Sequence, residues 1–325
     1  MLIKNAATLN IDLNTQDKEG FTDFHWACIR GLPKVVKILM ENASALSIDL
    51  NRKVPETGFT GLHWACNEGR TNVVKIIMEN AFDLMDKFGL SIDFNTKNSF
   101  GMTAFHRACD RGESQIVQIF MENAATLNID LQTKNRKGYT AFHLACQGGK
   151  SEVVKIFMEN AAALGINLNT KNNNGVTALH RACQRGQWDV VNFFMMYASN
   201  SYASTLSIDL NAKTKKGQTP FHLACNSGHS SVVRSIMKNA SYLNIDLNCK
   251  DNGGYSAFDL AAQGGKSEAV ETFVKTAATF NLNIKSNDSV TAFHRACQRG
   301  HHDVVLTIME YASTLSIDLN ATTRG

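Results

Sequence analysis

One short segment recurs throughout this chain, and it constrains the fold more than any other feature. One version reads GYTAFHLACQGG and begins at Gly138. The eight versions are anchored by His25, His63, His106, His143, His180, His222, Asp259 and His294, whose successive separations are 38, 43, 37, 37, 42, 37 and 35 residues. A unit of about 37 residues repeated through 325 residues predicts a solenoid in which each unit packs on its neighbours. The repeat overrides the expectation of two globular domains that the length alone would give.

Each repeat is expected to contain a short first helix that is closed at both ends. In the fourth repeat, Thr140 suits the N-cap, residues 141–147 the helix, and Gly149 the left-handed position that ends it. A glycine recurs at this closing position in all eight repeats: Gly31, Gly69, Gly112, Gly149, Gly186, Gly228, Gly265 and Gly300.

A longer second helix should follow, and then a polar loop. Two residues after the closing glycine we expect a second N-cap, at Thr71, Ser114, Ser151, Ser230 and Ser267, with Pro33 at the helix start in the first repeat. In the fourth repeat the apolar residues Val154, Phe157, Ala161 and Leu164 step by 3, 4 and 3, which places them on one buried face. Residues 166–175 are rich in turn formers and predict a loop.

The motif TPFHLA, residues 219–224, resembles the ankyrin signature T-P-L-H-x-A. The resemblance extends over essentially the whole chain and implies an all-α ankyrin-repeat solenoid of stacked helix-turn-helix units with projecting finger loops. The family unit has about 33 residues, so the four extra residues here predict one more helical turn, which we place around 161–164. Larger insertions lie within 82–90 and 199–205.

Both ends of the chain fall inside a repeat. Residues 5–13 are identical to residues 123–131, and residues 315–325 stop within a loop. We therefore expect residues 1–325 to form a single continuous array of about eight repeats, with partial repeats at both ends, that is part of a longer array. We expect a monomer, and the uncapped apolar ends leave end-to-end association open.

Composition narrows the classes of function. The net charge of +4 is small for this length and does not suggest nucleic-acid binding. No apolar run is long enough to span a bilayer, so we expect no membrane association and a soluble, cytoplasmic protein, with the nucleus as the other compartment open. Neighbouring stacked helices are too far apart for disulfides, so the eight cysteines should be reduced thiols. Cys249 lies off the repeat position, and we expect it to be exposed.

The only residues that look catalytic are a histidine and a cysteine three residues apart. Seven repeats carry both, and only the repeat at Asp259 lacks both. A metal pair or a Cys/His nucleophile is one interpretation, but a catalytic centre does not need seven evenly spaced copies. We favour a structural role, with the histidine reaching back to the capping threonine, because Ser256 and Asp259 form a capping box in the exceptional repeat. The chain is therefore not expected to be an enzyme, nor to use a metal or cofactor.

The remaining function is to bind a protein partner on the concave face. The ankyrin resemblance implies that partners contact the finger tips and the exposed positions of the first helices. The candidates before the capping threonine are Phe21, Phe59, Met102, Tyr139 and Tyr255, and those after the histidine include Trp26 and Trp64. The alternative for these rings is packing on the neighbouring finger. The loop residues Asn14, Asn51 and Asn169 resemble a position that asparaginyl hydroxylases modify in some family members.

Arginines form the second group of binding candidates. They comprise Arg30 and the like-charged i, i+4 pairs Arg107 with Arg111, Arg181 with Arg185, and Arg295 with Arg299. Helix stability does not predict such pairs, whereas a partner with an acidic patch would. The alternative for the arginines is that neighbouring carboxylates balance their charges. For the function of the protein, the alternatives are a structural spacer without a dominant ligand and a metal-binding or enzymatic use of the histidines and cysteines.

Overall fold

The fold is an all-α array of helix pairs. In this computed structural model, the structure describes residues 12–199, 206–280 and 292–312, and within these ranges it contains helices and no strand. The chain forms two compact units. Unit 1 comprises Met1–Ala145 with Ala163–Ile166, and unit 2 comprises Cys146–Ala162 with Asn167–Gly325.

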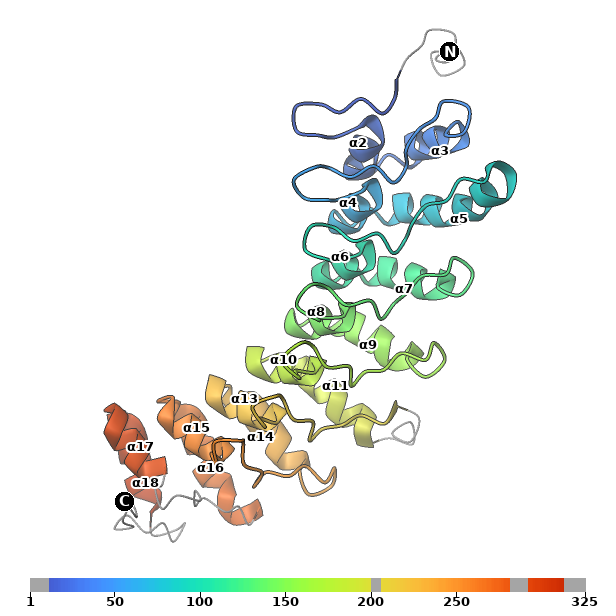
Figure 1. Ribbon diagram of the computed structural model, residues 1–325. Helices are drawn as coiled ribbons and strands as arrows, with labels where there is room; N and C mark the ends of the chain where they lie inside the picture. The colour runs from blue at the N-terminus through green and yellow to red at the C-terminus, as the bar shows by residue number, and fades with distance from the viewer. Residues whose placement is uncertain (1–11, 200–205, 281–291, 313–325) are drawn as a thin grey trace. The chain divides into compact units, whose positions relative to one another are not determined.

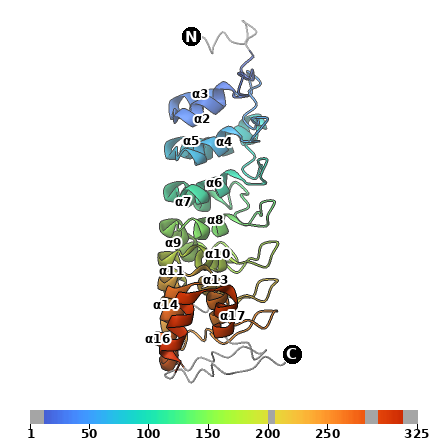
Figure 2. The same cartoon turned by 90° about the vertical axis from the view of Figure 1, so that its left-hand side faces the viewer.

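Unit 1 stacks its first helices in one layer and its second helices in another. The first helices are α2 (Asp23–Arg30), α4 (Gly61–Asn67) and α6 (Ala104–Arg111), and each packs on the next. The second helices are α3 (Pro33–Glu41), α5 (Thr71–Phe88) and α7 (Ser114–Asn123), which also pack in sequence (Figure 1). The loops before α4 and α6 project away from α5 and α7 (Figure 2), as finger loops should. Helix α8 (Ala141–Gln147) crosses the boundary between the units.

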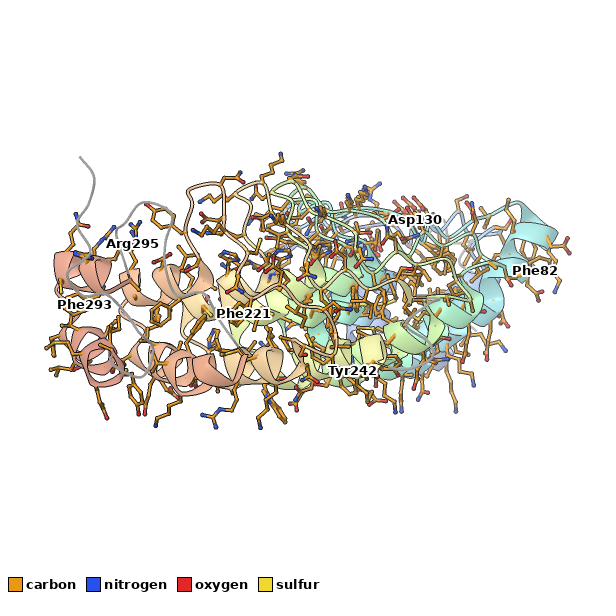
Figure 3. All side chains as sticks on the ribbon, turned by 90° about the horizontal axis from the view of Figure 1, so that it is seen from below. Phe82, Asp130, Phe221, Tyr242, Phe293 and Arg295 are labelled. Carbon is orange, nitrogen blue, oxygen red and sulfur yellow. The ribbon has the colours of Figure 1, made fainter. Side chains whose placement is uncertain are left out.

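Unit 2 has the same two layers. Its first helices are α10 (Ala178–Arg185), α13 (Pro220–Ser227), α15 (Ala257–Gln263) and α17 (Ala292–Arg299). Its second helices are α9 (Ser151–Asn160), α11 (Trp188–Ser199), α14 (Ser230–Asn239), α16 (Ser267–Phe280) and α18 (His302–Tyr311). Consecutive members of each layer are in contact, and Phe221 lies between the layers (Figure 3). The predicted all-α solenoid is confirmed.

In six of the repeats the histidine closes the start of its own helix, as expected. At α6 the backbone N–H of Thr103 donates to Nδ1 of His106 at 3.2 Å, and the Thr103 hydroxyl oxygen accepts from the His106 backbone N–H at 3.4 Å. Helices α2, α4, α10 and α13 have the same reciprocal capping box, and Ser256 with Asp259 forms it at α15. Since Nδ1 accepts from a backbone N–H, the neutral ring carries its proton on Nε2.

That Nε2 proton joins one repeat to the next. His63 donates from Nε2 to the carbonyl of Met102 at 3.0 Å, and His106 donates to the carbonyl of Tyr139 at 3.2 Å. In unit 2, His180 and His222 make the equivalent bonds to the carbonyls of Gln218 and Tyr255. Each of these rings therefore caps one helix and holds the finger of the following repeat.

A second ladder of hydrogen bonds joins an asparagine in the loop of one repeat to the loop of the next repeat. The side-chain amide of Asn51 donates to the carbonyl of Ser91 at 2.7 Å, and its oxygen accepts from the backbone N–H of Asp93 at 2.9 Å. The same pair of bonds is made by the amides of Asn14, Asn95, Asn169 and Asn211. These loop asparagines thus have a structural role between successive repeats.

The predicted glycine positions are confirmed, but the predicted caps of the second helices are wrong. All eight closing glycines have positive φ, between 64° and 87°. The residue that precedes each second helix is Arg70, Glu113 or Lys150 in the repeats that contain α5, α7 and α9, and none of these caps the helix with its side chain. Ser114 and its equivalents are the first helical residues. The N–H of Glu113 donates to the Ala108 carbonyl at 2.9 Å, so a backbone bond closes the short turn between α6 and α7.

The core consists of small first-helix residues and larger second-helix residues. The cysteines of α2, α4 and α6 and the preceding Ala side chains are buried, and so are most Val, Ile, Phe and Met side chains on the inner face of the second helices. In the fourth repeat Val154, Phe157 and Ala161 are buried, while Leu164 is partly exposed. The extra four residues form a turn after Asn160 that ends at Gly165, with φ 61°, rather than a further α-helical turn.

The insertion after the second repeat lengthens a helix. Helix α5 runs for 18 residues to Phe88, and Phe82, Met85 and Phe88 are exposed along its added part. Figure 3 shows Phe82 at the outer end of this helix. The other insertion, at residues 199–205, lies outside the described residues except for Ser199, which ends α11.

The histidine ladder predicts how stability depends on pH. Burial lowers the pKa of His63, His106 and His180 from 6.5 to about 4. The unfolded chain therefore binds more protons between about pH 4 and 6.5, and the free energy of unfolding should fall as the pH decreases through this window, by up to roughly 3 kcal/mol per histidine. Urea unfolding midpoints measured from pH 7 to pH 4.5 should decrease accordingly.

A box exchange provides the control. The double variant Thr177→Ser, His180→Asp copies the capping box of α15, in which burial raises the pKa of Asp259. A carboxyl with a raised pKa binds its proton more readily in the folded state, so the variant should lose less stability on acidification. Identical pH slopes for the two proteins would contradict the assignment.

Candidate functional site

Four rings in unit 1 form a continuous row along the bases of the first two fingers. Phe21 lies 5.0 Å from Trp26 and 5.5 Å from Trp64, measured between ring centroids, and Phe59 lies 4.9 Å from Trp64. We call these four residues the aromatic row. Its two ends are covered by arginines, because the guanidinium carbons of Arg30 and Arg107 lie 5.6 Å and 5.5 Å from the centroids of Trp26 and Phe59.

The members of the aromatic row differ in exposure. Trp26 is 37% exposed, and Phe21 and Trp64 are half-buried. Phe59 is only 7% exposed, so the expectation that it presents a partly exposed face is wrong. Its ring packs on Trp64 of the same repeat and is covered by Arg107, so this contact is not the packing on the neighbouring finger that was the alternative. Met102 and Tyr139, at the corresponding positions of later fingers, are half-buried.

The two tryptophans have different hydrogen bonding. The indole N–H of Trp26 donates to a carboxylate oxygen of Asp17 at 2.7 Å. The backbone N–H of Phe21 and this indole, among others, donate to Asp17 and lower its pKa. The indole nitrogen of Trp64 is buried and donates to no acceptor. Trp26 is therefore fixed by the tip of its own finger, whereas Trp64 is held by ring packing.

The arginine pairs bridge repeats. In unit 1 a guanidinium nitrogen of Arg107 donates to the side-chain oxygen of Asn67, in the preceding repeat, and another donates to Asp110 at 3.0 Å. Arg111 donates to the same oxygen of Asn67 at 3.1 Å. The expectation that stability does not explain the pairs is therefore wrong for Arg107 and Arg111, since they tie the end of one first helix to the next.

Unit 2 repeats this arrangement. Arg181 donates from Nε at 3.0 Å and from Nη2 at 2.5 Å to the side-chain oxygen of Gln147, and from Nη1 to Gln184 at 2.6 Å. The guanidinium carbon of Arg295, which Figure 3 labels, lies 4.1 Å from the ring centroid of Tyr255. Arg185 and Arg299 are exposed. Each pair thus has one inner arginine that packs and one outer arginine that is exposed, and the exposed Arg111 also donates to Asn67.

The finger tips carry a charge pattern that the sequence reasoning missed. Residues 96–101, 133–138, 170–175 and 212–217 contain cations and no acidic residue. In unit 1 the cations are Lys97, Lys134, Arg136 and Lys137, and in unit 2 they are Lys171, Lys213, Lys215 and Lys216; all eight are exposed. Some also bridge fingers, since the ammonium of Lys97 donates to the carbonyl of Lys134 at 3.2 Å. Counting charge by loop rather than over the whole chain would have revealed this pattern.

The histidines and thiols do not converge on a reactive centre in the part of the chain that the structure describes. There, no group of three or more His, Cys, Asp or Glu side chains is placed to hold a metal ion. Burial raises the pKa of the Cys66 and Cys146 thiols, which opposes formation of a nucleophilic thiolate. The expectation for Cys249 is wrong: it is 9% exposed, and its thiol lies 3.7 Å from the Lys250 carbonyl, whereas Cys297 is the exposed thiol.

Comparison with known proteins identifies the family. The family model for ankyrin repeats in sets of three matches residues 2–88, 87–165, 125–205, 163–251, 195–283 and 240–323, so the chain belongs to the ankyrin repeat family. Among solved structures, it is similar to the ankyrin repeat domain of Bcl-3, described as a unique member of the IkappaB protein family. The TM-score is 0.59 at 19% identity, over 74% of this chain and 94% of that one, which supports the fold alone.

A search of curated protein sequences gave no match. Proteins of the ankyrin family are generally protein-protein interaction modules and typically lack enzymatic activity. Over the residues that the structure describes, every helix is too short or too polar to cross a bilayer.

The different roles of the two arginines on α10 can be tested directly. Arg181→Ala removes the bonds to Gln147 and Gln184 and should lower the free energy of unfolding by about 1–2 kcal/mol. Arg185→Ala, on the same helix but exposed, should change it by less than about 0.5 kcal/mol. Urea denaturation of both variants measures the difference, and equal stabilities would show that the inner arginine does not brace the repeats.

Proposed function

We propose that this chain is a scaffold that holds a protein partner on the concave face, formed by the first helices and the finger loops. The aromatic row carries the proposal. Aromatic side chains that are rigidly held yet partly open to solvent lose little entropy on binding and are the commonest energetic anchors of protein interfaces. Trp26 and Trp64 meet both conditions, because neighbouring rings fix them while part of each remains exposed.

The charges on the first helices and finger loops of each unit support a partner with an acidic patch. The basic finger tips and the outer arginines Arg111, Arg185 and Arg299 are exposed in both units. Like-charged side chains repel one another at low salt, and an acidic partner surface reduces this repulsion. The proposed partner-binding residues are therefore Phe21, Trp26, Arg30, Trp64, Met102, Arg111, Tyr139, Arg185, Tyr255 and Arg299, with Phe59, Arg107, Arg181 and Arg295 supporting them from behind.

We further propose that residues 1–325 form one continuous array that works without catalysis in the cytoplasm or nucleus. Six cysteines at the repeat position are buried free thiols, which suits a reducing compartment. End-to-end association through helix α3 is a second proposal, because Val35 is 41% exposed while the equivalent Val73 and Ile116 are completely buried. A spacer without a dominant ligand is the competing function.

Site-directed photo-crosslinking in cells tests the binding face. A benzophenone amino acid at position 26 or 111 should capture a defined partner, because both side chains face solvent on the first-helix side. The same amino acid at position 37 or 75, exposed on α3 and α5, is the matched control. Capture of the same proteins from both sides, or of none, would favour the spacer function.

Charge reversal on the fingers of unit 2 tests the acidic patch. Lys215→Glu with Lys216→Glu should weaken binding of the captured partner about three- to tenfold at physiological salt, and the loss should shrink as salt is raised. Lys155→Glu with Lys238→Glu changes the charge equally on helices α9 and α14 of the same unit. Titrations that show equal losses for the two double variants would argue against a finger-side contact.

A further inference from the structure

A cleft opens between the first two fingers of unit 1. It has a volume of about 660 Å³, and the rings of Phe21 and Trp64 are among its lining residues. One wall is the tip of the first finger, residues 16–20, and the other is residues 54–57 of the second finger. The cleft therefore combines the inner part of the aromatic row with two polar loops.

The lining of this cleft is acidic, unlike the later fingers. Asp17, Glu19 and Glu56 contribute three carboxylates, and Lys18 contributes the only cation among the lining residues. Within the described residues, neither Glu19 nor Glu56 takes part in a salt bridge, and both are exposed. The finger tips at 96–101 and 133–138 carry the opposite charge.

We propose that this cleft binds a lysine or arginine side chain of the partner. A cation that enters between the fingers would lie against the electron-rich faces of Phe21 and Trp64, with the free carboxylates of Glu19 and Glu56 beside it. Aromatic faces attract cations most strongly when the site is partly closed to water, and opposite charges at the rim add to this attraction. An apolar side chain would gain only the aromatic contact, and a carboxylate would be repelled.

The existing cations of the aromatic row support this chemistry. Arg30 and Arg107 already lie over its two end rings, Trp26 and Phe59. The two inner rings, Phe21 and Trp64, are the ones that line the cleft. A partner cation there would continue a pattern in which rings and cations pack together along this surface.

The inference rests on the proposed scaffold function and makes it more specific. A partner that lies across unit 1 would place a basic residue between fingers one and two and acidic residues against Lys97, Lys134 and Lys137. This opposed charge pattern on a single unit would fix the direction in which an extended segment of the partner binds.

The direct test uses small probes that differ in the charge at the end of the side chain. The probes are Nα-acetyl-lysine methylamide, its norleucine counterpart, which has the same chain without the ammonium, and its glutamate counterpart. The indole N–H resonance of Trp64, assigned by its loss in Trp64→Phe, reports occupancy of the cleft in the full chain. We expect a saturable shift with the lysine probe, clearly weaker binding of the norleucine probe and no binding of the glutamate probe.

Paired variants separate charge from structure. Glu19→Gln with Glu56→Gln should weaken the lysine probe about three- to tenfold, whereas Glu41→Gln with Glu79→Gln, an equal charge change on α3 and α5, should leave it unchanged. Equal binding of the norleucine and lysine probes, or no saturable shift with lysine, would overturn the proposal. Crosslinking from position 26 would remain intact in that case, so loss of the cation site is distinguishable from loss of the scaffold function.

A selection experiment extends the test to peptides. Random peptides displayed on phage and selected on the full chain should be enriched in Lys or Arg, and the enrichment should disappear when the Glu19→Gln, Glu56→Gln chain is used. Enrichment that persists on this double variant would place cation binding elsewhere and contradict the assignment to the cleft.

Discussion

The structure depends on one neutral imidazole that is used twice in four of the repeats, those of His63, His106, His180 and His222. Nδ1 accepts the N–H of the capping threonine, which forces the proton onto Nε2, and this proton is then donated to a carbonyl of the following finger, as in the pairs His106–Tyr139 and His180–Gln218. A single buried side chain thus satisfies a helix terminus and a loop from a different repeat. Because the ring is enclosed, it must stay uncharged, so local capping and inter-repeat cohesion respond together to acid.

The asparagine ladder and the arginine bridges extend the same principle over the surface. Asn51 spans two repeats with both ends of its amide, and Arg107 reaches Asn67 of the preceding repeat while lying over Phe59. These contacts leave the fingers with fixed spacing. A surface in which Trp26 and the basic finger tips are held at set positions can recognise a partner without first paying the entropic cost of ordering its own loops.

In unit 1 the proposed recognition surface consists of exposed residues that are packed against buried ones. Phe59 and Arg107 are largely enclosed, and Phe59 packs on Trp64 while Arg107 lies over Phe59. Phe21 and Trp64 remain open to the cleft between the first two fingers, where the acidic residues Glu19 and Glu56 lie. Within one unit, an acidic aromatic cleft is thus followed by basic finger tips, a charge pattern that favours one orientation of a bound segment.

The sequence by itself determined the repeat, the two helices of each unit, the closing glycines and the capping role of the histidine, because these depend on residues within a few positions of one another. Gly112 and Thr103 could be assigned without any knowledge of neighbouring repeats. Only the tertiary structure decided that Phe59 is enclosed while Trp26 is exposed, that Arg181 braces Gln147, and that Cys249 is buried. Those outcomes depend on contacts between residues some 30 to 45 positions apart, whose geometry is set by how one repeat stacks on the next rather than by the pattern within either.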